Sequence, residues 1–289
     1  MATGGASLAE LRSANPGEWA AVERDLTELV AAQDRAALAR YVESVAAPLP
    51  AGSDPRARIR RQMAVAAVRA EWVQAAAGVR GGRIRFGLLN GFVAQRLLFA
   101  HGLERKPVSM GWFRAVWPLL WQRRRLLPLV QPKGIYCFYS RPLIDRLGEL
   151  IGDRPCLEIA AGDGTLSRFL RERGVHVTAT DDHSWKHAVT FPEAVIRQDA
   201  REALRVHAPT VVLCSWPPAG NRFEQHVFRT RSVELYVVIA STHAFAAGNW
   251  DDYRSQQGFT MVEDEALGAL VLPPELESAV YVFRRRDAG

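Results

Sequence analysis

The sequence contains little cysteine and almost no lysine. Only three of its 289 residues are cysteine, and only three of its 37 basic residues are lysine. The thiols of Cys137, Cys156 and Cys214 are odd in number, widely spaced and mostly in apolar surroundings, which argues against disulfides and against a zinc site. No group of His, Cys, Asp and Glu has metal-ligand spacing. We therefore expect reduced core thiols and no bound metal.

Long apolar runs are also missing. No uncharged apolar stretch is long enough to cross a bilayer, and residues 1–14 lack the basic start and apolar core of a secretion signal. We therefore expect a cytoplasmic protein with no membrane partner. The sequence contains no feature from which an oligomeric state can be predicted.

The remaining composition is that of a globular protein, with 48% hydrophobic and 24% charged residues. Ala, Leu, Arg and Glu dominate residues 19–47 and 56–78, where apolar residues recur at helical spacing. Two prolines between Pro128 and Gly134 indicate a junction. We therefore predict an all-helical accessory domain over residues 1–132 and a second domain over residues 133–289.

A strand, turn and helix pattern opens the second domain. Leu157 and Ile159 are typical of the end of a buried strand, and Gly162 and Gly164 permit a tight turn before a helix that begins at Thr165. The free N–H groups at the start of that helix would face the turn. A second strand follows over residues 175–179 and places a carboxylate, Asp181, at its carboxyl end.

The segment resembles the first motif of class I S-adenosylmethionine-dependent methyltransferases, Glu/Asp-x-Gly-x-Gly-x-Gly. Glu158, Gly162 and Gly164 match that motif, and Ala160 replaces its first glycine. A dinucleotide-binding fingerprint instead requires a third glycine where this chain has Ser167. The resemblance covers residues 133–286 and implies an α/β fold, with a Rossmann-like, mostly parallel seven-strand sheet following the helical domain. Later strands are expected over residues 194–197, 210–214, 234–240, 259–262 and 279–283.

The resemblance also implies a binding site for S-adenosyl-L-methionine. The glycine turn would surround the methionyl part, Asp181 the ribose, with Asp182 as a competing ligand, and Asp199 with Ala200 the adenine. An aromatic segment before the first motif, in which Ser140 is a predicted helix N-cap, would cover the methionyl end. The full set of expected cofactor-binding residues is Tyr139, Glu158, Ala160, Ala161, Gly162, Gly164, Thr165, Asp181, Asp182, Asp199, Ala200 and Ser215.

Ser215-Trp216-Pro217-Pro218 follows the fourth strand, where the family places its substrate-facing loop. The segment is similar to the Asn/Asp/Ser-Pro-Pro-aromatic motif of amino-methyltransferases acting on adenine, but Trp216 is interposed and the final aromatic is absent. A sulfonium methyl is already activated, so transfer requires positioning of the acceptor and, for some acceptors, removal of a proton. Candidate catalytic residues are His183, Ser215, Trp216, Glu224 and His243.

Charge is distributed unevenly, with 23 Lys and Arg against 13 Asp and Glu up to Arg154. A basic lobe is suited to an acidic acceptor. We expect a methyltransferase acting on an N or O atom, with a small molecule or peptide favoured as the substrate. The alternatives are an amino-methyltransferase acting on nucleic acid, an NAD(P)-dependent oxidoreductase and a non-enzymatic cofactor-binding protein.

Trp117 and Trp121, four residues apart, are expected to pack on one helical face.

Overall fold

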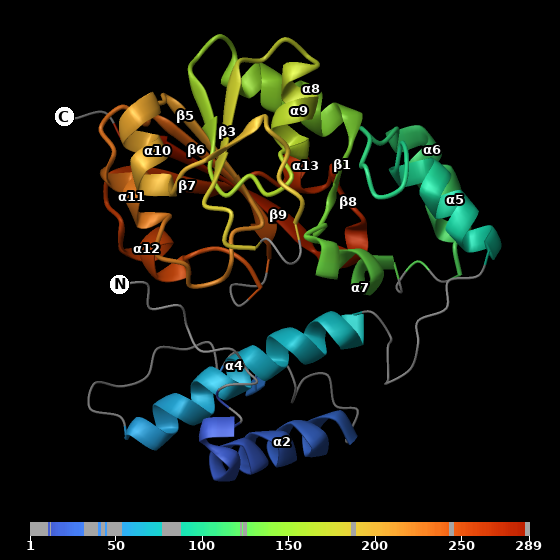
Figure 1. Cartoon of the computed structure of the whole chain (residues 1–289), viewed down its shortest axis with the longest axis vertical. Helices are drawn as coiled ribbons and strands as arrows, with labels where there is room; N and C mark the ends of the chain where they lie inside the picture. Colours follow the sequence, from blue (N-terminus) through green and yellow to red (C-terminus); the bar gives the residue numbers. More distant parts are fainter. Residues whose placement is uncertain are drawn as a thin grey trace. The chain divides into compact units, whose positions relative to one another are not determined.

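The computed structural model describes residues 11, 13–31, 40, 41, 44, 54–76, 88–121, 123, 126–185, 189–242 and 246–286 (Figure 1). The chain divides into two compact units, Met1–Ala76 and Ala77–Gly289. The junction predicted at residue 133 therefore lies inside the second unit. No helix among these residues has both the length and the apolar character that a membrane span requires.

The first unit is helical, as the sequence predicts. Its two long helices, α2 (Pro16–Ala31) and α4 (Pro55–Ala76), pack on each other. Val22 of α2 and Met63 and Ala64 of α4 are buried in their shared core. Arg60 also forms an ion pair with Glu18 of the neighbouring helix. Apolar side chains from both helices thus form the small core that joins them.

The second unit contains the predicted seven-strand sheet, in the order β4-β3-β2-β5-β6-β9-β7. Only β9 runs antiparallel to its neighbours β6 and β7, so the sheet is mostly parallel. The strands are β2 (Cys156–Glu158), β3 (Val177–Asp181), β4 (Val195–Arg197), β5 (Val211–Ser215), β6 (Leu235–Ser241), β7 (Phe259–Glu263) and β9 (Ser278–Arg285). Because β3, β2 and β5 are parallel and adjacent, their carboxyl ends meet at one edge of the sheet.

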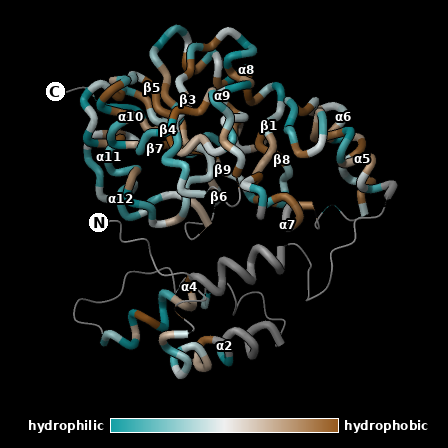
Figure 2. Tube along the Cα trace, in the orientation of Figure 1, coloured by the Kyte–Doolittle hydropathy of each residue, from teal (hydrophilic) through white to brown (hydrophobic). Residues whose placement is uncertain are grey.

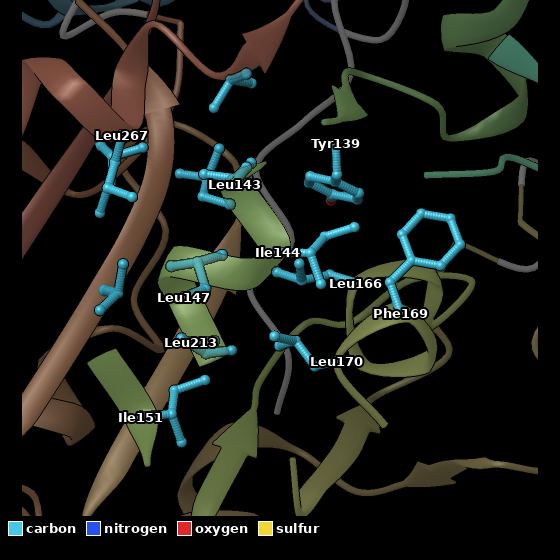
Figure 3. Close-up of a cluster of buried hydrophobic side chains, with 14 of the residues drawn as sticks. Tyr139, Leu143, Ile144, Leu147, Ile151, Leu166, Phe169, Leu170, Leu213 and Leu267 are labelled. Carbon is cyan, nitrogen blue, oxygen red and sulfur yellow. The ribbon is translucent and has the colours of Figure 1, made fainter. Parts of the chain in front are cut away.

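Helices cover both faces of this sheet. One core contains residues of α8 (Arg141–Ile151), α9 (Thr165–Arg171) and α13 (Glu265–Gly268), and the other contains residues of α10 (Ala200–His207), α11 (Gln225–Arg229) and α12 (Trp250–Ser255). Alternation along β5 divides its side chains between them, since Val211 and Leu213 join the first core and Val212 and Cys214 the second. Figure 3 shows the first core, where Leu147 and Leu170 lie close to Leu213. Strands that are buried on both faces have almost continuous apolar sequences, and such segments are brown in Figure 2.

A smaller core lies beside the sheet in the same unit. It surrounds the two-stranded pair of β1 (Phe138–Tyr139) and β8 (Val271–Leu272). Side chains come from α5 (Leu88–Leu98), α6 (Met110–Val116), the 3-10 turn η1 (Trp117–Leu119) and α7 (Leu126–Val130), which is followed by the turn η3 (Gln131–Lys133). A last turn, η4 (Pro274–Leu276), precedes β9. Ser140 caps α8 as predicted, since its Oγ accepts a hydrogen bond from the Leu143 N–H at 3.2 Å.

The two tryptophans expected to share a helical face do not do so. Trp117 is buried and its Nε1 donates to Glu275 at 3.0 Å, whereas Trp121 is 94% exposed. The prediction for Trp121 is wrong because α6 ends at Val116 and the backbone is extended at Leu120. The helical spacing of four residues therefore does not extend to Trp121.

Candidate functional site

Three adjacent strands end in unusual backbone geometry at the same edge of the sheet. Ala160, His183 and Trp216 follow β2, β3 and β5 with positive φ angles of 50°, 59° and 55°. The other non-glycine residues with positive φ in the described chain, Ala208 and Glu277, are ordinary caps that end α10 and η4. Left-handed backbone costs free energy in residues with a side chain and is concentrated at functional sites. This edge is therefore the candidate site.

The turn after β2 requires its second glycine for two reasons. Gly164 has φ of 67°, and a Cβ there would lie 2.6 Å from Cγ2 of Val195. The turn is closed by a hydrogen bond of 2.9 Å from the Gly164 N–H to the Ala161 carbonyl. The Ala161 N–H in turn donates to the Thr180 carbonyl of β3 at 3.0 Å. The predicted glycine turn is thus present and is attached to the neighbouring strand.

Asp181, the last residue of β3, joins this turn to its own strand. Its Oδ2 accepts a hydrogen bond from the Gly162 N–H at 3.0 Å, and its Oδ1 accepts one from the His183 N–H at 2.8 Å. Burial raises the pKa of Asp181, against the opposing effect of these two hydrogen bonds. Each carboxylate oxygen has a second lone pair, so the group can still accept two hydroxyls. Asp182 is exposed and its Oδ1 accepts from the Ser184 N–H at 2.8 Å.

Glu158 is buried beneath the turn. Its carboxylate accepts hydrogen bonds from the N–H and the hydroxyl of Ser167 in α9, and only 1% of the residue is exposed. Burial raises the pKa of Glu158 to about 7. The Glu158 carboxylate therefore holds the first turn of α9 through Ser167. The backbone of Ala160, Ala161 and Thr165 belongs to the turn itself.

A buried arginine at this turn was not predicted from the sequence. Arg105 lies between α5 and α6, and its Nη2 donates to Oδ1 of Asp163 at 2.6 Å. The same oxygen accepts the Thr165 N–H at 3.1 Å. No sequence pattern around Arg105 distinguishes it from other arginines. Only the tertiary fold brings it to the turn. Asp163, between the two glycines, was also missing from the predicted set.

The strand end of β5 carries two of the predicted residues. Ser215 and Tyr139 share a hydrogen bond of 2.8 Å between their hydroxyls, so the aromatic lead-in does reach the fourth strand. The indole of Trp216 lies nearly parallel to the ring of Tyr136, with 6.2 Å between ring centroids. Its Nε1 is buried without a hydrogen-bond partner in the described chain. Trp216 packs against both cores, which places it over the edge of the sheet.

His183 and Asp199 lie on the other side of Asp181. The His183 ring stacks on Phe191 with 4.0 Å between centroids, and its Nε2 is buried without a partner among the residues described. Asp199 is exposed and caps α10, because its Oδ1 accepts from the Glu202 N–H at 3.0 Å. Ala200 is the first residue of that helix. Their predicted contacts with adenine stay predictions.

Glu224, another candidate base, is enclosed by its own hydrogen-bond partners. Glu224 is fully buried and its two oxygens accept hydrogen bonds from Tyr236, Tyr253 and the Asn249 N–H, as well as from Asn221. Because these donors occupy the carboxylate, Glu224 supports the loop after β5 and is not positioned as a base. His243 lies outside the described residues. The described part of the chain contains no group of three or more His, Cys, Asp and Glu that could hold a metal ion.

Comparisons with known proteins give distant structural likenesses. No family model and no curated protein matches the sequence. The tRNA (uracil-54, C5)-methyltransferase of Pyrococcus abyssi in complex with S-adenosyl-L-homocysteine is 16% identical, with a TM-score of 0.35 over 50% of this chain and 37% of that chain. This chain therefore spans little more than a third of that enzyme.

Two further solved structures are similar at this level. Magnesium protoporphyrin IX methyltransferase from Synechocystis PCC 6803 with bound cofactor is 11% identical, with a TM-score of 0.35 over 50% of this chain and 79% of that chain. A mutant of MtNAS in complex with S-adenosylmethionine is 14% identical, with a TM-score of 0.37 over 92% and 97%. These likenesses are distant, and the Rossmann-like arrangement of this chain, a mostly parallel seven-strand sheet with helices on both faces, rests on its own strand pairing and cores.

Proposed function

We propose that this chain is a methyltransferase that uses S-adenosyl-L-methionine and methylates an N or O atom of a small molecule or peptide. The observation that carries the proposal is the hydrogen bond between the Asp181 carboxylate and the Gly162 N–H. It joins an acidic strand end to a glycine turn. A half-buried carboxylate beside such a turn is suited to a ribose, whose two hydroxyls are donors.

The acceptor would lie over β5. Trp216 and Tyr136 offer aromatic faces there, and the hydroxyls of Ser215 and Tyr139 are directed at each other. The bound cofactor supplies an activated methyl group, so the protein must mainly hold the acceptor lone pair in line with the carbon–sulfur bond and exclude water. The Trp216 N–H donates a hydrogen bond of 2.7 Å to the Ile239 carbonyl, which fixes the start of the loop after β5.

A proton must leave when the acceptor is a hydroxyl or an ammonium group. His183 is a predicted base that the described structure places at this edge, since its backbone N–H donates to Asp181 and its Nε2 lacks a partner in the described chain. An unprotonated imidazole nitrogen can take such a proton. A neutral amine would need no base, so the pH dependence of turnover distinguishes the two kinds of acceptor.

Calorimetric titration with S-adenosylmethionine tests the cofactor assignment. We expect Asp181→Ala to weaken binding by at least tenfold, because the ribose hydroxyls lose their acceptor. The matched control is Asp153→Ala, which removes an exposed carboxylate just before β2, at the opposite edge of the sheet. An unchanged affinity in Asp181→Ala would contradict the assignment, and binding of NAD(P) in place of S-adenosylmethionine would favour an oxidoreductase.

The acceptor class can be tested with cofactor labelled in its methyl group. The full chain and a cell extract are incubated together, and the label is then measured separately in small molecules, protein and nucleic acid. We expect label in the small-molecule or peptide fraction. Label in nucleic acid would instead support an amino-methyltransferase of that class, and cofactor binding without any transfer would indicate a non-enzymatic binding protein.

A further inference from the structure

Arg105 reaches the glycine turn because its segment runs beside β1. The backbone of Arg105 forms a bridge with Phe99 at the end of α5. Three residues later, the Val108 N–H donates to the Tyr139 carbonyl at 3.0 Å, and the Arg141 N–H donates to the Val108 carbonyl at 2.9 Å. These bonds attach the connection between α5 and α6 to the lead-in of the first motif. They fix the backbone from which Arg105 extends.

The guanidinium of Arg105 is almost fully enclosed. Its side chain is 6% exposed, its Nη1 donates to the Cys137 carbonyl at 2.9 Å, and its Nη2 donates to Asp163. Its Cζ lies 5.4 Å from the centroid of the Tyr139 ring. Burial lowers the pKa of Arg105, but Asp163, Tyr139 and Cys137 together raise it by more, so the pKa is raised overall and the group keeps its charge.

One donor of this buried cation is not used. The Nε of Arg105 has no hydrogen-bond partner among the described residues. A buried donor without a partner costs free energy, and such a group calls for an explanation such as a ligand. Because the donor belongs to a cation, the ligand group that would satisfy it best is an anion, and a carboxylate fits the planar guanidinium.

Asp163 links the same cation to the turn. Its Oδ1 accepts from both Arg105 and the Thr165 N–H, so the ion pair holds the first turn of α9 next to Gly162 and Gly164. In S-adenosylmethionine the only carboxylate is on the methionyl tail. The ion pair therefore lies at the part of the site that our proposed function gives to that tail, and the unused donor belongs to the same guanidinium.

We propose that Arg105 determines the preference of this site for an adenosyl ligand that carries an amino-acid tail. This inference rests on the proposed function. Arg105 holds the turn through Asp163 and keeps one donor for the tail carboxylate. Asp181, on the far side of Gly162, serves the ribose and makes no such distinction. Recognition of the two ends of the cofactor is thus divided between the two residues.

Two ligands separate these roles. S-adenosylhomocysteine carries the tail carboxylate, whereas 5′-methylthioadenosine has the same adenosine and no amino-acid tail. Calorimetric titration of the full chain should show that Arg105→Gln weakens binding of S-adenosylhomocysteine at least tenfold and of methylthioadenosine less than twofold. Arg105→Lys keeps the charge and should recover part of the loss. Asp181→Ala should weaken both ligands to a similar extent.

The control variant is Arg146→Gln, which removes an exposed arginine of α8. It should bind both ligands like the unmodified chain, and melting temperatures measured without ligand should confirm that every variant folds. Equal weakening of both ligands in Arg105→Gln and Arg105→Lys, or undiminished binding of S-adenosylhomocysteine in Arg105→Gln, would overturn the inference alone. Failure of the unmodified chain to bind either ligand would overturn the proposed function as well.

Discussion

The glycine loop, residues 159–164, and the proline loop, residues 216–223, leave neighbouring strands at the same edge of the sheet, but different forces hold them. Charged groups hold the glycine loop, through Asp181 on Gly162 and Arg105 on Asp163. The two carboxylates remain partly accessible, since the Asp163 side chain is 32% exposed and Asp181 is half-buried. A loop held by accessible charges and backbone N–H groups can exchange some of these contacts for a ligand.

A closed internal network holds the proline loop. Glu224 is fully buried and accepts from two tyrosine hydroxyls, from Asn221 and from the Asn249 N–H at 2.9 Å. The Gly248 N–H also donates to the Pro217 carbonyl at 3.0 Å. Because all of these hydrogen bonds join residues of the protein to one another, we expect the proline loop to keep its conformation when a ligand binds. A bound cofactor should therefore rearrange the glycine loop more than the proline loop.

Removal of the Glu224 carboxylate should have the largest effect. Glu224→Ala leaves two buried tyrosine hydroxyls and an N–H without their acceptor, and each unsatisfied group costs about 1–3 kcal/mol. We expect a loss of about 3–5 kcal/mol in the free energy of unfolding, measured by urea denaturation. Glu224→Gln keeps one carbonyl acceptor and should lose less. A loss below about 1 kcal/mol in Glu224→Ala would show that the network does not hold the proline loop.

Stability should also depend on pH through Glu158, the buried acid of the glycine loop. Its pKa is about 7 in the folded chain, above the usual value near 4.3 in an unfolded chain. The folded state therefore binds the proton more tightly, so its contribution to stability is complete below about pH 4 and is lost as the pH rises through 7. Between pH 5 and 8 the free energy of unfolding should fall by about 2–3 kcal/mol from this group.

Glu158→Gln isolates this contribution, since glutamine does not titrate. Burial also raises the pKa of Asp181 and of Glu224, so the unmodified chain carries further contributions of the same sign. The difference between the two pH profiles, each from urea denaturation at several pH values, reports Glu158 alone. Parallel profiles would mean that Glu158 is already ionised in the folded chain at pH 5.

The sequence predicted the parts of the site that depend on local pattern. The strand, turn and helix around Gly162 and Gly164 follow from apolar runs and from the conformational freedom of glycine. Asp181 follows from its position at the end of an apolar strand. The structure brings these residues together as expected, because parallel neighbours must end at one edge of a sheet.

The contacts that depend on tertiary structure could not be predicted. Arg105 is 58 residues from Asp163 along the chain, and no periodicity relates them. Glu224 looked like a candidate base because it follows the proline loop, but Tyr236 and Tyr253 enclose it from later elements. Helical spacing likewise failed at Trp121, where the helix stops early. Side-chain burial is set by packing partners that a local pattern does not contain.

The smallest expected effect on stability comes from the residues with positive φ near the start of the two loops. Ala160 has φ of 50°, where the related motif has glycine, and the proline loop begins with Trp216 at φ of 55°. Left-handed backbone costs an alanine about 1–2 kcal/mol, and glycine avoids that cost but loses about 0.5–1 kcal/mol through the entropy of the unfolded chain. Ala160→Gly should therefore raise the free energy of unfolding by about 0.5 kcal/mol.

Ala161→Gly is the matched control, because the neighbouring alanine does not have positive φ. It should lower the free energy of unfolding by about 0.5–1 kcal/mol, since glycine there adds unfolded-state entropy and relieves no strain. Chemical denaturation of both variants measures the two signs. If the alanine at Ala160 instead fixes the turn for its ligand, Ala160→Gly will gain stability while its affinity for S-adenosylmethionine falls. A loss of stability in both variants would show that the positive φ of Ala160 does not destabilise the folded chain. Ala160 and Trp216 would then resemble each other only in their backbone dihedral angles.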